Sequence, residues 1–162
     1  MGVHYSSETP EWYTPPKIIE RAVLVMGAID LDPCSNEGDP AIPAAQHFTQ
    51  AEDGLRQLWG GRVYMNPPYG REIGDWVEHL CKQYELGEVD EAIALVPART
   101  DTKWFRRFRA YPRCFVWGRL RFSGHETGAP FPSMVVYLGR YWRKFLAAFS
   151  DIGDVYAVVG TQ

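Results

Sequence analysis

Asn66, Pro67, Pro68 and Tyr69 place an amide, two rigid imino acids and an aromatic ring at one point of the chain. Proline holds φ at about −65° and has no N–H, so the carbonyl oxygens of Asn66 and Pro67 are not taken up by a following helix or strand. With the Asn66 amide oxygen they can accept both hydrogens of one NH2 group, and the Tyr69 ring can stack on the base that carries it. We therefore predict that Asn66, Pro67 and Tyr69 are catalytic residues acting on an aromatic amine.

The segment directly before these residues, Gly61 to Met65, is an apolar run of the kind that forms a buried strand. In open α/β sheets, ligands bind at the carboxyl ends of the strands. We therefore expect the Asn66 side chain at a ligand-binding edge. A plain Pro-Pro turn after a strand is the alternative interpretation.

The Asn-Pro-Pro-Tyr element resembles the catalytic motif of S-adenosylmethionine-dependent amino-group methyltransferases, most closely that of the compact phage- and prophage-encoded DNA N6-adenine methyltransferases. The resemblance covers about residues 11 to 139 and implies S-adenosylmethionine as cofactor, double-stranded DNA as partner and the N6 amine of a flipped-out adenine as target. It needs no metal. The wider group also includes enzymes that act on RNA adenine or protein glutamine, and a catalytically silent nucleic-acid-binding module is a further alternative.

Three further segments resemble cofactor-binding or target-binding elements of this family. Trp12, Tyr13, Thr14 and Pro15 resemble the segment that contacts the amino-acid end of the cofactor. Physically, Thr14 can offer a hydroxyl and a backbone N–H at a helix start, where a carboxylate is favoured. Thr14 could equally serve as the N-cap of that helix.

The second cofactor segment contains Asp30, Asp32, Pro33 and Cys34, which resemble the Asp-Pro element whose acid neutralises the methionine ammonium. Asp53 resembles the acidic element near the cofactor adenine or the target, with an exposed turn as the alternative. The family's glycine-rich loop is missing. Since 33 residues lie between Asp32 and Asn66, too few for two strand–helix units, we expect a partly reduced fold.

The charge is unevenly distributed along the chain. Residues 1–98 hold 6 Lys or Arg and 16 Asp or Glu, whereas residues 99–144 hold 11 Lys or Arg and only 2 acidic residues. A basic second half next to an acidic first half is typical of a protein that binds a polyanion on one face. A solvated run of charges without a binding partner is the alternative. The predicted nucleic-acid-binding residues are Arg99, Lys103, Arg106, Arg107, Arg119, Arg121 and Phe122. Phe122 could instead be a hairpin core position.

Apolar periodicity predicts strands alternating with helices. The expected helical segments are 17–26, 55–58, 74–84, 102–109 and 142–149. The expected strands are 28–31, 61–65, 92–96, 114–117, 134–138 and 155–159, and a segment around 47–49 has no assigned structure. This order predicts a compact α/β, Rossmann-like class I methyltransferase sandwich with a mostly parallel sheet and an antiparallel edge hairpin. We expect a loose segment over residues 1–11 and one domain over 12–162.

The rest of the sequence gives no signal for a metal site, a disulfide framework, a membrane span or secretion. The four histidines lack metal-ligand spacing, and the three cysteines include no CxxC pair, which favours a reducing compartment. There is no run of eighteen apolar residues and no secretory leader pattern. We therefore expect a cytoplasmic protein of a bacterial host cell.

Overall fold

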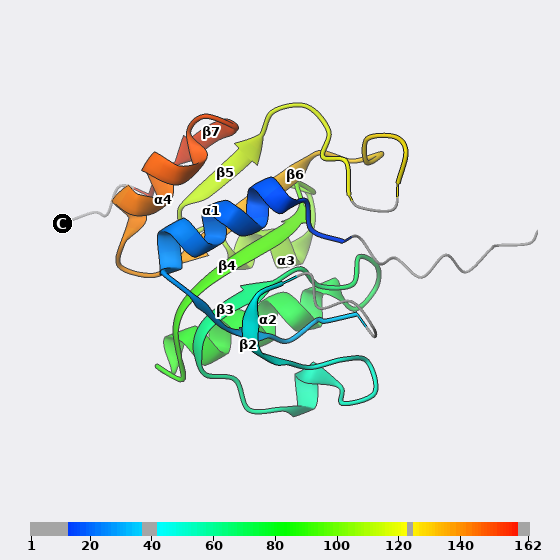
Figure 1. The fold of residues 1–162 in the computed structure, drawn as a ribbon, viewed down its shortest axis with the longest axis vertical. Helices are drawn as coiled ribbons and strands as arrows, with labels where there is room; N and C mark the ends of the chain where they lie inside the picture. Colours follow the sequence, from blue (N-terminus) through cyan, green and yellow to red (C-terminus); the bar gives the residue numbers. More distant parts are fainter. Residues whose placement is uncertain (1–12, 37–41, 123–124, 159–162) are drawn as a thin grey trace, which may run out of the picture.

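A computed structural model describes residues 13–36, 42–122 and 125–158 of the chain. Its centre is a seven-stranded sheet with the order β2-β1-β3-β4-β6-β5-β7 (Figure 1). The strands are β1 (Ile29–Asp32), β2 (Ala44–His47), β3 (Gly61–Met65), β4 (Val89–Pro97), β5 (Arg113–Val116), β6 (Ser133–Leu138) and β7 (Gly153–Tyr156). The helices are α1 (Pro16–Met26), α2 (Ile73–Glu85), α3 (Lys103–Arg107) and α4 (Trp142–Phe149), with a short 3-10 turn, η1 (Gly54–Arg56).

The sheet has a parallel half and an antiparallel half. β2, β1, β3 and β4 are parallel neighbours. β6 runs antiparallel to both β4 and β5, and β7 runs antiparallel to β5. The carboxyl ends of β1, β3 and β4 therefore meet at one edge of the sheet, where Asn66 follows β3.

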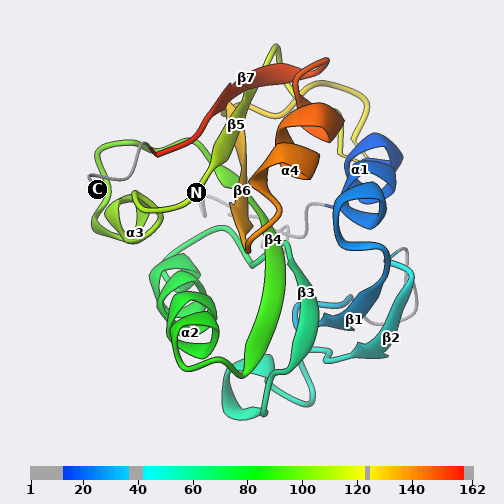
Figure 2. The same cartoon turned by 90° about the vertical axis from the view of Figure 1, so that its left-hand side faces the viewer.

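Both faces of the sheet are covered by helices. Figure 2 shows α1 and α4 on one face and α2 and α3 on the other. Because β4 lies in the middle of this sandwich, every side chain from Ala92 to Val96 is 0% exposed. Such a strand reads as a continuous apolar run, as expected for a parallel sheet buried on both faces.

Local sequence explains how α1 is placed. Pro16 occupies the first turn, where a missing N–H has no cost, and Ile18, Ala22 and Val25 follow at helical spacing and are buried. The helix ends at Gly27, whose φ of 83° suits glycine. This start of α1 holds Thr14 beside the carboxyl end of β3.

The structure confirms the predicted α/β sandwich and the order of its elements. The antiparallel hairpin is present as β5 and β6, but it is not the outermost pair, because β7 adds a further strand beyond β5. Between β1 and β3 the described residues hold one strand, β2, and the η1 turn, which agrees with the expected reduction. The predicted loose segment 1–11 lies outside the described residues.

Candidate active site

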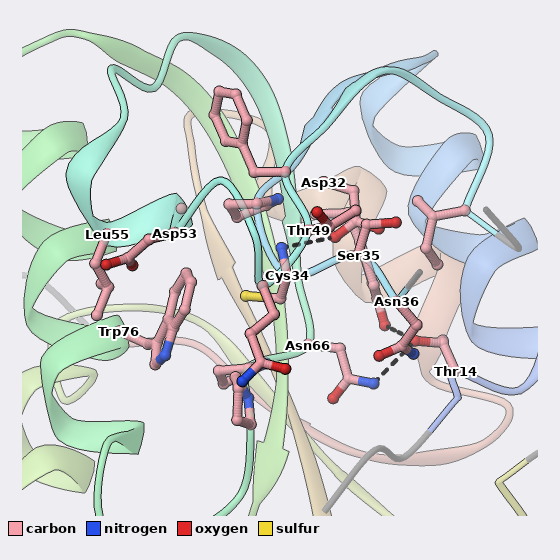
Figure 3. Close-up of a pocket in the computed structure, with 18 of the residues that line it drawn as sticks. Thr14, Asp32, Cys34, Ser35, Asn36, Thr49, Asp53, Leu55, Asn66 and Trp76 are labelled. Atoms are coloured by element: carbon pink, nitrogen blue, oxygen red, sulfur yellow. Dashed lines mark hydrogen bonds between the residues drawn. The ribbon is translucent and has the colours of Figure 1, made fainter. Parts of the chain in front are cut away.

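A cavity of about 560 Å³ opens at the carboxyl ends of β1 and β3. It brings together the start of α1, the loop after β1, the segment before η1 and the tetrapeptide after β3. The predicted site residues that line it are Tyr13, Thr14, Asp32, Pro33, Cys34, Asp53, Asn66 and Pro67. In Figure 3, Asp53, Leu55 and Trp76 lie on one side of this cavity, and Thr14 and Asn66 lie on the other.

The Asn66 side chain is held by a hydrogen bond to Thr14. The Asn66 Nδ2 atom donates to Thr14 Oγ1 at 3.2 Å, and Thr14 Oγ1 lies 2.8 Å from the Tyr64 hydroxyl oxygen. Since the amide nitrogen faces Thr14, the amide oxygen points to the other side (Figure 3). The alternative interpretation, that Thr14 is the N-cap of α1, is wrong. Pro15 occupies the N-cap position, without a side-chain cap.

Tyr69 anchors the tetrapeptide on the neighbouring strand. Its hydroxyl donates to the Leu95 carbonyl of β4 at 3.2 Å, and only 9% of the residue is exposed. The ring packs edge-on against Phe131 and Phe122, with centroid distances of 5.4 and 6.3 Å. Tyr69 is thus not among the residues lining the cavity in this structure. Phe122 is 0% exposed and lies in the hydrophobic core, as its alternative interpretation held.

Asp32 is a buried carboxylate at the cavity wall. It is 4% exposed, and its Oδ1 accepts the Cys34 backbone N–H at 3.1 Å. Its Oδ2 lies 3.5 Å from Nδ1 of His47 on β2. Burial raises the pKa of Asp32 to about 6, although the Cys34 N–H and His47 oppose that shift.

Asp30 lies outside the cavity and has a different partner. Its carboxylate accepts from Arg62 Nε at 2.9 Å, from Arg62 Nη2 at 3.1 Å and from the Arg62 backbone N–H at 2.7 Å. These hydrogen bonds lower the pKa of Asp30. The residue therefore joins β1 to β3. Pro15 is also not among the lining residues, and Trp12 lies outside the described residues.

Asp53 and Gly54 shape the opposite wall. Asp53 has a φ of 53°, an uncommon left-handed conformation for a residue other than glycine. A Cβ at Gly54 would lie 2.3 Å from the Pro33 carbonyl oxygen and 3.0 Å from the Trp76 ring. Only glycine therefore allows this segment to close against the loop after β1.

The sequence was also compared with known families. The model of the DNA N-6-adenine-methyltransferase (Dam) family matches residues 4–151, which include the cavity and the Asn-Pro-Pro-Tyr element. The chain belongs to this family. A comparison with curated proteins found no match. The chain is thus a Dam-family protein, and methylation of adenine in DNA is the activity for which the family is named.

The predicted DNA-contacting residues of the Dam-family chain fall into two groups. Lys103, Arg106 and Arg107 border a surface depression between α2 and α3, whereas Arg99, Arg119 and Arg121 are exposed on loops. Arg99 follows β4, which is parallel to β3, and so reaches the same sheet edge as Asn66.

Arg107 differs from its neighbours because it is engaged with α2. Its Nε lies 2.8 Å from Glu78, and its two terminal nitrogens lie 2.6 and 2.9 Å from Glu85. Its charge is therefore neutralised within the protein, whereas Lys103 and Arg106 are exposed.

Sequence reasoning did not single out Tyr64, Phe48 or Trp76, which also line the cavity. Trp76 is a buried residue of α2, but apolar periodicity alone does not show whether a buried side chain faces a packed core or a cavity. Tyr64 had a usable signal. It stands two residues before Asn66 in a strand, so the two side chains share one face of the sheet.

Among the described residues, no three His, Cys, Asp or Glu side chains are grouped in a way that could hold a metal ion. In the same part of the chain, no helix combines the length and the apolar character needed to cross a bilayer.

Proposed function

We propose that this Dam-family protein transfers a methyl group from S-adenosylmethionine to the N6 amine of an adenine flipped out of double-stranded DNA in the bacterial cytoplasm. The observation that carries the proposal is the position of Asn66. Its amide is oriented by Thr14 at the wall of a cavity that also contains the buried carboxylate of Asp32. Under this proposal, an acceptor for the base amine and a counter-ion for a cationic cofactor would share one cavity.

The cavity residues fit the cofactor by size and by chemistry. A volume of about 560 Å³ lies within the range of about 300 to 1,000 Å³ that is common for small-molecule sites. Asp32 would hold the ammonium group, Thr14 the carboxylate, and Asp53 with Leu55 and Trp76 the adenine end. When bound, S-adenosylmethionine supplies an electrophilic methyl group on sulfur.

The protein's part in the chemistry is orientation. The lone pair of an adenine amine is delocalised into the ring and points poorly toward an electrophile. Asn66 Oδ1 and the Pro67 carbonyl would accept its two N–H bonds, drawing the nitrogen toward tetrahedral geometry and aiming it at the methyl group. Orientation and fixed acceptors of this kind can lower a barrier by several kcal/mol.

The extruded base also needs a stacking surface, since unstacking costs a few kcal/mol. Tyr69 is our candidate because it belongs to the same rigid tetrapeptide. Its ring contacts Phe131 at 5.4 Å in this structure, so stacking on a base would require part of this aromatic cluster to open.

The phosphates would be bound at the edge of the sheet that carries Asn66. Lys103, Arg106 and Arg99 are exposed there, and Arg119 and Arg121 extend the basic surface from the loop before β6. Such contacts give affinity without reading sequence, because phosphates are the same at every base pair.

The test is incubation of the protein with methyl-labelled S-adenosylmethionine and, separately, duplex DNA, RNA or protein, followed by nucleoside or amino-acid analysis. We expect label in DNA as N6-methyladenine. Label confined to RNA or to protein glutamine would replace DNA as the substrate. Cofactor binding without any transfer would instead indicate a silent nucleic-acid-binding module.

A further inference from the structure

Tyr64 is a fully buried tyrosine whose hydroxyl reaches the cavity wall. It is 0% exposed, and burial raises the pKa of its phenol well above the ordinary value, so the hydroxyl keeps its proton. Its oxygen lies 2.8 Å from Thr14 Oγ1, across 50 residues of sequence. Tyr64, on β3, and Asn66, directly after β3, thus approach the same hydroxyl group of Thr14.

The direction of the hydrogen bonds follows from counting protons. Thr14 Oγ1 is the hydrogen-bond partner that the described residues offer the Tyr64 hydroxyl. A buried O–H without an acceptor costs about 1 to 3 kcal/mol, so Tyr64 donates and Thr14 accepts. Thr14 Oγ1 also accepts from Asn66 Nδ2 at 3.2 Å. A hydroxyl oxygen has two lone pairs, and both are then used.

This direction determines how Asn66 presents its amide. With its lone pairs filled, Thr14 has its own proton turned away from Asn66, and only the amide nitrogen of Asn66 can face it. Without the Tyr64 proton, Thr14 could donate to the Asn66 oxygen instead. The amide could then turn over and offer N–H groups to the adenine amine, which needs acceptors.

The same direction determines what Thr14 offers to the cavity. Thr14 is 5% exposed and lines the cavity. With two donors on its oxygen, the Thr14 proton is left to point along the remaining tetrahedral direction, where it can be donated to an anionic group. A ligand carboxylate bound there and the Asn66 amide would thus be coordinated through one atom, Thr14 Oγ1.

We infer that Tyr64 is a positioning residue that orients the Thr14 hydroxyl, and through it both the acceptor face of Asn66 and the donor offered to the carboxylate of the cofactor. The inference rests on the proposed function, because it assigns these two groups to adenine and to S-adenosylmethionine. Tyr64 itself touches neither reacting atom.

The first test is Tyr64→Phe, which removes the proton and keeps the ring. We expect kcat to fall about 10- to 100-fold and the cofactor Kd to rise by no more than about 10-fold. Thr14→Val, which removes the hydroxyl itself, should lose at least about as much as Tyr64→Phe. Tyr111→Phe is the matched control, since the Tyr111 hydroxyl lies near Glu85, away from the cavity.

A double-mutant cycle separates positioning from simple loss of packing. If Tyr64 acts through Thr14, the Thr14→Val/Tyr64→Phe variant should be no slower than Thr14→Val alone, because the two residues serve one chain of hydrogen bonds. Additive losses, or wild-type turnover in Tyr64→Phe beside an inactive Asn66→Ala, would overturn the inference. An active Asn66→Ala variant would instead count against the proposed function.

A third test does not depend on methyl transfer, so it can be applied even if the wild-type protein shows no activity. NMR of the Asn66 side-chain amide should show slow hydrogen exchange in the wild type and in Tyr111→Phe. Exchange at least about 10-fold faster in Tyr64→Phe and Thr14→Val would support the hydrogen-bond chain. Equal exchange rates in all four proteins would contradict it.

Discussion

Asn66 carries the most direct test of the proposed chemistry, because it is the polar side chain of the tetrapeptide. We expect Asn66→Ala to lower methyl transfer by at least about 100-fold, since an acceptor for the developing charge on the amine is lost. The cofactor Kd should stay within a few-fold, because the contacts proposed for Thr14 with the carboxylate and for Asp32 with the ammonium group do not involve Asn66. Single-turnover transfer and calorimetric binding would measure the two effects. Gln46→Ala, an exposed amide on β2, is the control.

At neutral pH, the buried carboxylate of Asp32 should lower the free energy of unfolding of the protein. Burial raises the pKa of Asp32 to about 6, so the protonated form suits the fold better than the ionised form. The contribution of protonated Asp32 to the free energy of unfolding is fully present below about pH 4 and is lost as the pH rises through about 6. Asp32→Asn should therefore raise the free energy of unfolding by about 1 to 3 kcal/mol at pH 8 and change it little at pH 4. Urea unfolding at both pH values measures the difference.

Asp30 is the matched control for that prediction, because its pKa is shifted in the opposite direction. Arg62 lowers the pKa of Asp30, so its contribution to stability is present at neutral pH and is lost in acid. Asp30→Asn should therefore destabilise the protein at pH 8. If Asp32→Asn were also destabilising there, the buried carboxylate would be better satisfied than we argue.

At the scale of elements, Arg107 joins α3 to α2. The helix α3 spans only five residues, and Arg107 links it to Glu78 and Glu85 of α2. Arg107→Gln should cost about 1 kcal/mol of unfolding free energy, because both carboxylates are half exposed and screened by solvent. The salt dependence of DNA binding should stay unchanged, since the charge is already neutralised. If Arg107→Gln lowered the salt dependence of DNA binding as much as Arg106→Gln does, Arg107 would be shown to bind phosphate.

At the scale of the whole molecule, the uneven charge predicts a DNA-binding face. The net charge is −3, yet Lys103 and Arg106 are exposed beside the depression between α2 and α3. Lys103→Gln/Arg106→Gln should lower the slope of log Kobs against log salt by about 1 to 2, because each phosphate contact contributes about 0.9. Lys17→Gln/Lys82→Gln makes the same charge change on other exposed sites. Equal slopes in the two variants would remove α3 from the DNA-binding surface.

Sequence alone determined the local features of this protein. The strand before Asn66, the helices with apolar spacing and the αβ order all follow from periodicities of the backbone, which act over a few residues. The Pro-Pro pair likewise predicted a rigid, acceptor-rich turn at the carboxyl end of a strand. The uneven charge was visible from counting.

Tertiary structure decided which of these residues meet. Asp30 and Asp32 are two residues apart, yet one pairs with Arg62 and the other is buried at the cavity. Arg106 is exposed while Arg107 is engaged by α2, and the Tyr69 ring is packed in an aromatic cluster. The hydrogen bonds from Thr14 to Tyr64 and Asn66 span 50 and 52 residues. No local pattern encodes such contacts, because they arise only when the packing of helices on the sheet brings distant side chains to one place.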